Sequence, residues 1–248
     1  MIIRILHLAA HELNLNGEKG NLFCLQQRLR WSGLECEIIC SPNESSIPGN
    51  IDAVFIGSGT VSGADQALSK LEIHRDSLLD IAKSGAPFLA LGLGWEILGQ
   101  SIRFADGEQV SGLGIFPSRS VRVERRVSCE SSGYDNSGVL TTGYANHQSN
   151  ITLDSGVRAL VQLQAGHGNS STLDFASVPG EGLLHENLMA ARLNGPLLPM
   201  NPHLADQFID LIASNTGFKY EQSSTQAKSA DAFAESAREE LRQRLLRK

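Results

Sequence analysis

The stretch PFLALGLGWEILG, at positions 87–99, decides the fold of this chain of 248 residues. Its first five residues predict a buried strand, Gly92 and Gly94 predict a tight turn, and a helix is expected from Trp95. In α/β enzymes such a turn is a nucleophile elbow, which presents one side chain at the start of a helix. The backbone N–H groups just after it, here beginning with Leu93, can hold an oxyanion.

Apolar strands alternate with amphipathic helices around this elbow. Strands are expected at 2–9, 34–40, 51–59 and 86–91, and helices at 20–33, 67–85 and 95–102. This alternation predicts an α/β fold with a mostly parallel central sheet flanked by helices.

The second half of the chain has a different texture. From Ser111 onward more strands than helices are expected, at 114–126, 138–149, 157–169 and 187–195. A polar segment (219–230) then leads into a charged C-terminal helix (231–248) with only a thin apolar stripe. We therefore expect one domain over residues 1–218, followed by a tail of residues 219–248 that forms a peripheral or partner-docking helix.

The composition excludes several classes of protein. A net charge of −6 and an isoelectric point near 5.6 argue against a nucleic-acid surface, which needs a basic excess or stripe. The chain has no run of about 18 apolar residues, so no membrane span is predicted. The N-terminal MIIRILHLAAHELN lacks a small-residue cleavage site, so it predicts a strand of a cytoplasmic protein and not a signal peptide.

The four cysteines are too scattered to suggest a shared site. They show neither C-x-x-C spacing nor clustered histidines, so neither a zinc site nor a disulfide framework is predicted. Buried free thiols are the expected state of Cys24, Cys36, Cys40 and Cys129 in a reducing compartment.

Several blocks in a fixed order give the chain a family resemblance. They are LNLNGEKGN (13–21), DGEQVSGLGIF (106–116), GYANH (143–147), GHGN (166–169) and EGLLHENLMAARLNGPLLPMNP (181–202). Together with the elbow, they resemble the class I glutamine amidotransferases of the CobB/CobQ-like kind. The resemblance is strongest to the GatD type, which are the glutaminase subunits of lipid II isoglutaminyl synthases.

This resemblance implies a partner and a pathway. GatD-like subunits form a heterodimer with a Mur-ligase-like subunit, MurT, and deliver ammonia from glutamine to it. The partner uses ATP and Mg to activate the D-glutamate of the peptidoglycan stem peptide, so this chain itself is expected to carry no cofactor. Glutamine is the ligand that the resemblance implies for this chain.

Two departures from the family pattern concern the catalytic residues. Gly92 stands where active members carry the nucleophilic cysteine, and the family's His-Gly-Pro step reads Asn194-Gly195-Pro196. Asparagine has no pKa near neutrality and cannot act as the general base. Removing core members of a related triad costs on the order of a million-fold in rate. No cysteine lies at a predicted strand-to-helix turn, and no histidine lies at the Gly-Pro step, so a pseudo-glutaminase is expected.

Other positions in the matched blocks are candidate binding residues. Arg126 falls where the family places an arginine implicated in glutamine binding, and a guanidinium can clamp a carboxylate; a solvated surface arginine is the alternative. The loop from Gly57 to Gly59 matches the glycine loop that supplies part of the oxyanion hole, or is an ordinary tight turn. His147 is expected to be structural, and the charges around Glu239 to be a solvated helical face.

Three functions remain compatible with the sequence. The first is a GatD-like pseudo-glutaminase subunit that stabilises its partner, lets the partner use free ammonia, or regulates an active paralogue. The others are an active glutaminase with relocated residues and a non-catalytic subunit that binds an amino acid through Arg126 and the Gly57–Gly59 loop. Glutamine hydrolysis and ligand binding, measured separately, distinguish them.

Overall fold

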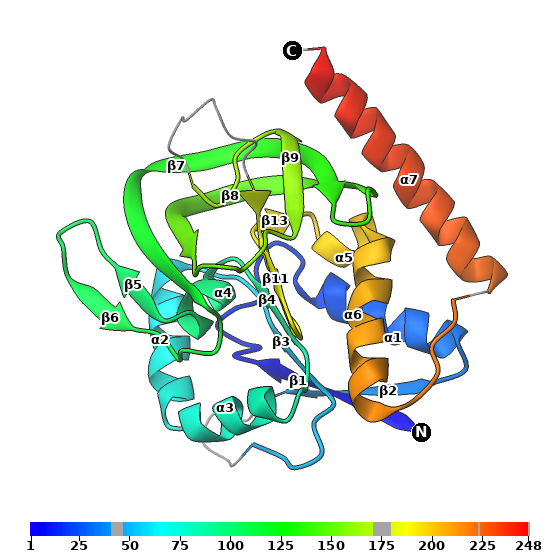
Figure 1. Ribbon diagram of the computed structural model, residues 1–248, viewed down its shortest axis with the longest axis horizontal. Helices are drawn as coiled ribbons and strands as arrows, with labels where there is room; N and C mark the ends of the chain where they lie inside the picture. The colour runs from blue at the N-terminus through cyan, green and yellow to red at the C-terminus, as the bar shows by residue number, and fades with distance from the viewer. Residues whose placement is uncertain (41–46, 171–179, 223, 248) are drawn as a thin grey trace.

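The computed structural model describes residues 1–40, 47–170, 180–222 and 224–247 (Figure 1). Two positions of the predicted tail, Ser223 in the polar segment and Lys248 at the end of the last helix, lie outside the described residues.

A mostly parallel sheet forms the centre of the molecule, as the sequence predicts. Its strand order is β11-β12-β4-β3-β1-β2, and all neighbours are parallel except the antiparallel pair β11–β12. The strands are β1 (Ile2–Leu8), β2 (Glu35–Cys40), β3 (Ala53–Ile56), β4 (Phe88–Leu91), β11 (Leu183–His185) and β12 (Leu188–Ala191). Every residue of β3 and β4 is buried, as expected where helices cover both faces of a parallel sheet.

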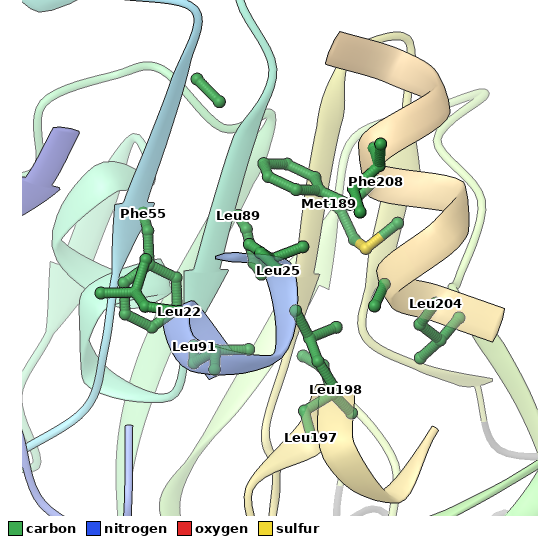
Figure 2. Close-up of a cluster of buried hydrophobic side chains, with 14 of the residues drawn as sticks. Leu22, Leu25, Phe55, Leu89, Leu91, Met189, Leu197, Leu198, Leu204 and Phe208 are labelled. Carbon is green, nitrogen blue, oxygen red and sulfur yellow. The ribbon is translucent and has the colours of Figure 1, made fainter. Parts of the chain in front are cut away.

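Helices cover the two faces of this sheet. The helices on one face are α1 (Lys19–Trp31), α5 (Leu197–Met200) and α6 (Pro202–Thr216); on the other they are α2 (Val61–Glu72), α3 (Arg75–Lys83) and α4 (Leu93–Leu98). Alternate residues of each strand serve the two resulting cores: Phe55 packs against α1, α5 and α6, whereas its neighbour Val54 packs with α2 and α3. Figure 2 shows the first core, in which Leu25 of α1 and Phe208 of α6 meet Leu89 of β4.

A second sheet accounts for the strand-rich second half. Its main order is β10-β9-β7-β5-β6, with β8 paired to both β7 and β13. The strands are β5 (Ser101–Arg103), β6 (Gln109–Ser111), β7 (Ser118–Asp135), β8 (Leu140–Leu153), β9 (Val161–Ala165), β10 (Gly180–Glu181) and β13 (Leu193–Asn194). The long β7–β8 hairpin arches over the carboxyl end of the parallel sheet, next to the elbow (Figure 1).

Two helix predictions need correction, and one helix was not predicted. The single helix expected at 67–85 is two helices, α2 and α3, because the chain leaves helical geometry at His74 (φ −108°, ψ 7°). The helix expected at 95–102 begins at Leu93 and ends at Leu98, since Gly99 is extended and leads into β5. Helix α6 was not predicted, because its apolar residues follow a proline-rich stretch that reads as a loop.

The last helix, α7 (Thr225–Leu246), runs along one side of the molecule (Figure 1). It begins earlier than predicted, at the cap made by Ser224, whose Oγ accepts a hydrogen bond from Ala227 N at 3.1 Å. In the described parts of the chain, no helix combines the length and apolar character needed to cross a membrane.

Candidate functional site

The elbow joins β4 to α4 through Gly92. This residue has φ 50° and ψ −119°, a conformation that residues with a side chain rarely adopt. Its amide donates to the Ala191 carbonyl of β12 at 2.9 Å, which fixes the turn to the sheet. The sharp backbone of a nucleophile elbow is therefore present although the side chain is not.

Ser58 occupies the space next to the elbow. A Cβ placed on Gly92 would lie 2.3 Å from Ser58 Oγ and 2.7 Å from Ser58 Cβ, so the two side chains cannot coexist in this arrangement. Ser58 Oγ also accepts a hydrogen bond from Leu93 N at 3.2 Å. Leu93 N–H is the amide expected to hold an oxyanion, so the serine hydroxyl takes the place of the substrate oxygen as well as that of the nucleophile.

The loop that carries Ser58 is packed too tightly to move aside easily. A Cβ on Gly57 would meet the Leu13 carbonyl at 2.6 Å, and one on Gly59 would meet the Glu12 carbonyl at 2.5 Å. Both glycines are needed because backbone packs against backbone here. The loop from Gly57 to Gly59 is therefore a rigid support for Ser58.

Glu18 lies beneath the same loop and is almost fully buried. Its side chain contacts Gly57, since a Cβ there would lie 2.8 Å from Glu18 Cγ, and it receives a hydrogen bond from Asn21 Nδ2 at 3.3 Å. Burial raises the pKa of Glu18 to about 8, against the opposing hydrogen bonds from Ser58 N and Asn21. The loop thus rests on a carboxyl group that is mostly protonated at neutral pH.

A cavity of about 310 Å³ opens in front of the elbow. Of the residues singled out from the sequence, Gly59, Gly92, Leu93, Arg126 and His147 line it together, whereas Gly57 and Asn194 lie outside its described lining. Ser58, Glu96 and Arg122 also line it, and sequence reasoning gave none of them a role there. No short sequence motif marks Ser58, because its contact with Gly92 arises only when β3 pairs with β4.

Glu96 and Arg122 form an ion pair on the wall of this cavity. Arg122 Nε lies 3.2 Å from Glu96 Oε2, and Ser149 Oγ donates to Glu96 Oε1 at 2.7 Å. Glu96 stands where the resemblance places glutamine, so the wall carries a buried charge pair in place of a neutral amide.

Arg126 reaches the cavity from the far side of a bulge in β7. Its Nη1 donates to Asn146 Oδ1 at 2.9 Å, while the side chain remains exposed. The arrangement fits both readings of this residue, since a surface arginine held by one hydrogen bond keeps other N–H groups for a ligand.

His147 also lines the cavity, and it is buried and bonded to Arg192. Arg192 Nη1 lies 3.1 Å from His147 Nδ1, and a guanidinium can only donate, so Nδ1 accepts. Burial, followed by the charge of Arg192, lowers the pKa of His147 to about 3. Such an imidazole stays neutral near pH 7 and has no lone pair free at Nδ1, which makes it a poor general base.

Asn194 lies in β13 at the Gly-Pro step and is half-buried. Its Nδ2 donates to the Tyr144 carbonyl of β8 at 3.1 Å. The Asn194 side chain therefore links β13 to the backbone of β8.

The cysteines provide no substitute nucleophile among the described residues of the cavity lining. Burial raises the pKa of Cys24 and of Cys36 to about 12, so both are thiols at neutral pH. In the described parts of the chain, no group of three His, Cys, Asp or Glu side chains could hold a metal ion.

The fold is that of the class I glutamine amidotransferases. A crystal structure of a glutamine amidotransferase superposes with a TM-score of 0.60 at 16% identity, covering 84% of this chain and 98% of that one. The glutaminase domain of Trypanosoma brucei CTPS, with bound acivicin, gives 0.51 at 12% identity, covering 91% and 98%. These likenesses establish the fold alone.

The sequence comparisons give the family. The model of the CobB/CobQ-like glutamine amidotransferase domain matches residues 17–201, and the chain belongs to that family. The lipid II isoglutaminyl synthase (glutamine-hydrolyzing) subunit GatD of Staphylococcus aureus (strain N315) is 27% identical over 226 residues, covering 88% of either chain. The subunit of the same name from Streptococcus pneumoniae (strain ATCC BAA-255 / R6) is 23% identical over 213 residues, covering 84% of this chain and 79% of the relative.

Proposed function

We propose that this chain is the GatD-like subunit of a lipid II isoglutaminyl synthase-type complex and does not itself hydrolyse glutamine. The complex amidates the D-glutamate of the peptidoglycan stem peptide in the cytoplasm. The membership of the CobB/CobQ-like family and the likeness to two GatD subunits over most of their length support the first part.

The position of Ser58 is the observation that carries the second part. Covalent glutaminase chemistry needs a nucleophile at the elbow and a free N–H that holds the oxyanion. Here the serine side chain fills the first place and accepts the hydrogen bond from Leu93 N at the second. A carboxamide therefore finds neither group available.

The residues that could act as a general base support the same conclusion. Asn194 is tied to the Tyr144 carbonyl at the base position, and His147 is neutral and engaged with Arg192. A relocated cysteine–histidine pair would need a thiol beside the cavity, and the described lining contains none.

The chain's contribution is then structural or regulatory. The partner is a Mur-ligase-like subunit of the MurT type, which binds ATP and Mg and activates the carboxylate. The subunit described here stabilises that partner, or regulates nitrogen delivery to it, while free ammonia serves as the nitrogen source.

Co-purification with the Mur-ligase-like subunit, followed by an amidation assay, tests this function. We expect amidation with ammonium and none above background with glutamine, and we expect no glutamate release from glutamine with or without the partner. The S. aureus GatD relative serves as the positive control for glutamate release. Release well above background that disappears in a Cys129→Ser or Cys40→Ser variant would show an active glutaminase with relocated residues.

A gain-of-function series tests the assignment of the two positions. Gly92→Cys alone should remain inactive because Ser58 obstructs the thiol and caps Leu93 N–H. Ser58→Gly, Gly92→Cys and Asn194→His combined should give weak glutamate release. Equal activity of the single and triple variants would contradict the obstruction by Ser58.

A further inference from the structure

An irregularity in the β7–β8 hairpin places two arginines in one cavity. Arg122 pairs with Ser149 and Val127 pairs with His147, so the four residues 123–126 of β7 stand opposite the single residue Gln148. Gln148 Nε2 donates to the Glu124 carbonyl at 2.8 Å, which ties the bulged segment to β8. Bulges of this kind redirect side chains beside functional sites. Arg122, which precedes the bulged segment, and Arg126, its last residue, both line the cavity.

Arg122 is a buried charge with unused donors. Its side chain is only 11% exposed, and its Nε faces Glu96 Oε2. Within the described part of the chain, no acceptor is found for its Nη1 and Nη2, and these atoms are not among the buried polar atoms that lack partners. The two terminal nitrogens therefore face the open cavity, where a guanidinium can hold a carboxylate through two hydrogen bonds.

The two arginines that line the cavity are held by partners on different elements. Arg122 is next to Glu96 of α4, on the helix that starts at the elbow, whereas Arg126 is bound to Asn146 of β8. Ser58 adds a donor at the elbow end, because its Oγ accepts from Leu93 N and its own hydroxyl hydrogen remains available. A ligand in the cavity thus meets two cations, one paired with Glu96 of α4 and one bonded to Asn146 of β8.

Charge and hydrogen-bonding type favour an acid over an amide at the elbow end. The lining holds two guanidinium groups and one carboxylate, so it is net positive. The carboxylate has few sites left for an amide NH₂, since Ser149 Oγ donates to Glu96 Oε1 and Glu96 Oε2 is buried against Arg122. A ligand carboxylate accepts from every donor present, whereas a carboxamide brings its own N–H groups against them.

We infer that the cavity binds a short amino-dicarboxylate of the glutamate type in preference to glutamine, with Arg126 at one carboxylate and Arg122 at the other. This inference rests on the proposed function, because it takes the cavity at the elbow to be a binding site of a subunit that does not hydrolyse glutamine. The volume of about 310 Å³ is at the small end of ligand sites and suits a molecule of amino-acid size. Arg122 is then a binding residue of the site in addition to Arg126.

Isothermal titration calorimetry of the full chain tests this preference. The probes are L-glutamate, L-glutamine, glutarate, which lacks the amine, and inorganic phosphate as a simple anion. We expect L-glutamate to bind about tenfold or more tightly than L-glutamine, since charge-assisted hydrogen bonds exceed neutral ones. Glutarate should stay close to L-glutamate, and phosphate should bind far more weakly than either.

Three arginine variants locate the preference. Arg122→Gln should lower L-glutamate affinity about tenfold while leaving L-glutamine within about twofold, whereas Arg126→Gln should weaken both ligands alike. Arg125→Gln is the matched control, because Arg125 is an exposed residue of the same bulge outside the described lining. Its affinities should equal those of the unmodified chain.

A double variant that neutralises both members of the ion pair controls for loss of stability in Arg122→Gln. Arg122→Gln leaves Glu96 buried without its partner, so Glu96→Gln/Arg122→Gln should be measured as well. It should fold, bind L-glutamine as before and lose the preference for L-glutamate. Glu96→Gln alone should bind L-glutamate more tightly, because it removes the negative charge beside Arg122.

Several results would overturn the inference. These are equal or tighter binding of L-glutamine, no detectable binding of either amino acid, an unchanged ratio in both Arg122 variants, or an equal loss in Arg125→Gln. Failure of the proposed function is seen separately, as glutamate release from glutamine by the unmodified chain. Absence of release together with a preference for L-glutamine would reject this inference and leave the proposed function standing.

Discussion

The elbow at Gly92 and the Gly-Pro step at Asn194 are the two places where the family resemblance puts the amidotransferase dyad, yet their surroundings differ. At the elbow a neighbouring side chain, Ser58, has taken the vacated space and the hydrogen bond of Leu93 N. At the step Asn194 is half-buried and its Nδ2 donates to the Tyr144 and Arg192 carbonyls. A neighbouring side chain therefore packs into the space beside Gly92, which we call a repacked position. At Asn194 only the residue type differs from the family pattern, which we call an exchanged position.

A catalytic side chain is therefore harder to accommodate at position 92 than at position 194. A repacked position resists the original residue, because its neighbours now depend on the smaller one. An exchanged position on a half-exposed strand accepts either residue with little effect on stability. Substitutions in the two regions should therefore differ in their cost to folding.

Gly92→Cys is expected to have the largest effect. The new Cβ would lie 2.3 Å from Ser58 Oγ, in a backbone conformation that disfavours side chains. Overpacking and backbone strain together should lower the free energy of unfolding by about 3–5 kcal/mol. Urea denaturation measures this change. The variant Ser58→Gly/Gly92→Cys is the control and should recover roughly 1–3 kcal/mol of the loss, since it removes the clash but not the strain. A stability of Gly92→Cys equal to that of the unmodified chain would mean that Ser58 moves freely.

Glu18 beneath the Ser58 loop should make stability depend on pH. In the unfolded chain the carboxyl ionises above about 4.5, whereas in the folded protein its pKa is about 8. Folding therefore binds a proton between these values, and the free energy of unfolding falls as pH rises across them. At 1.36 kcal/mol per pKa unit, Glu18→Gln should remove roughly 3 kcal/mol of this decline between pH 5 and 8.

Denaturation of both proteins at several pH values checks the role of Glu18. Buried histidines such as His203, whose pKa is lowered to about 4 by burial, titrate in both proteins and cancel in the difference. Parallel curves for Glu18→Gln and the unmodified chain would show that the carboxyl is ionised in the folded state.

Thr60→Ala tests the other end of the Ser58 loop. Thr60 Oγ1 accepts from Gly63 N at 3.0 Å and caps α2. Loss of this cap should cost about 1 kcal/mol in thermal or urea unfolding. Thr60→Ser keeps the hydroxyl and serves as the control; if it destabilises as much as alanine does, the cap is not the cause.

Asn194→His should have the smallest effect. The side chain is half-buried and its removal gives up hydrogen bonds to the Tyr144 and Arg192 carbonyls at 3.1 and 3.4 Å. A histidine N–H can replace one of them, so the free energy of unfolding should stay within about 0.5 kcal/mol. A loss comparable to that of Gly92→Cys would erase the distinction between the two regions.

The general fold was predictable because it depends on local patterns. Apolar strands that alternate with amphipathic helices give a parallel sheet whatever their partners, and the glycines around Leu93 mark a turn without reference to the rest of the chain. The break at His74 and the start of α6 were missed, since in both places tertiary packing overrides a weak local signal. The expected domain boundary at residue 218 stays a prediction.

The site was less predictable because its contacts are distant in sequence. Ser58 and Gly92 meet only through the pairing of β3 with β4, and Arg122 enters the cavity only because β7 bulges against β8. Neither fact has a signature within a short window of residues. Gly92, Leu93 and Arg126 were found because the family resemblance supplied them, and their roles stay predictions.

Ion pairs and hydrogen bonds hold helix α7 on the rest of the protein more than buried apolar side chains do. Only three of its residues are buried, Ala227, Ala234 and Arg238. Arg28 Nη1 donates to Asp231 at 2.7 Å, and Arg238 Nη1 donates to the Met200 carbonyl at 2.7 Å. The pair between Arg244 of α7 and Glu130 of β7 is far more exposed than Arg28, so raising the ionic strength screens it most, while apolar burial stays intact. The attachment of α7 is therefore the part of this molecule that salt weakens first, while the two cores around the parallel sheet remain folded.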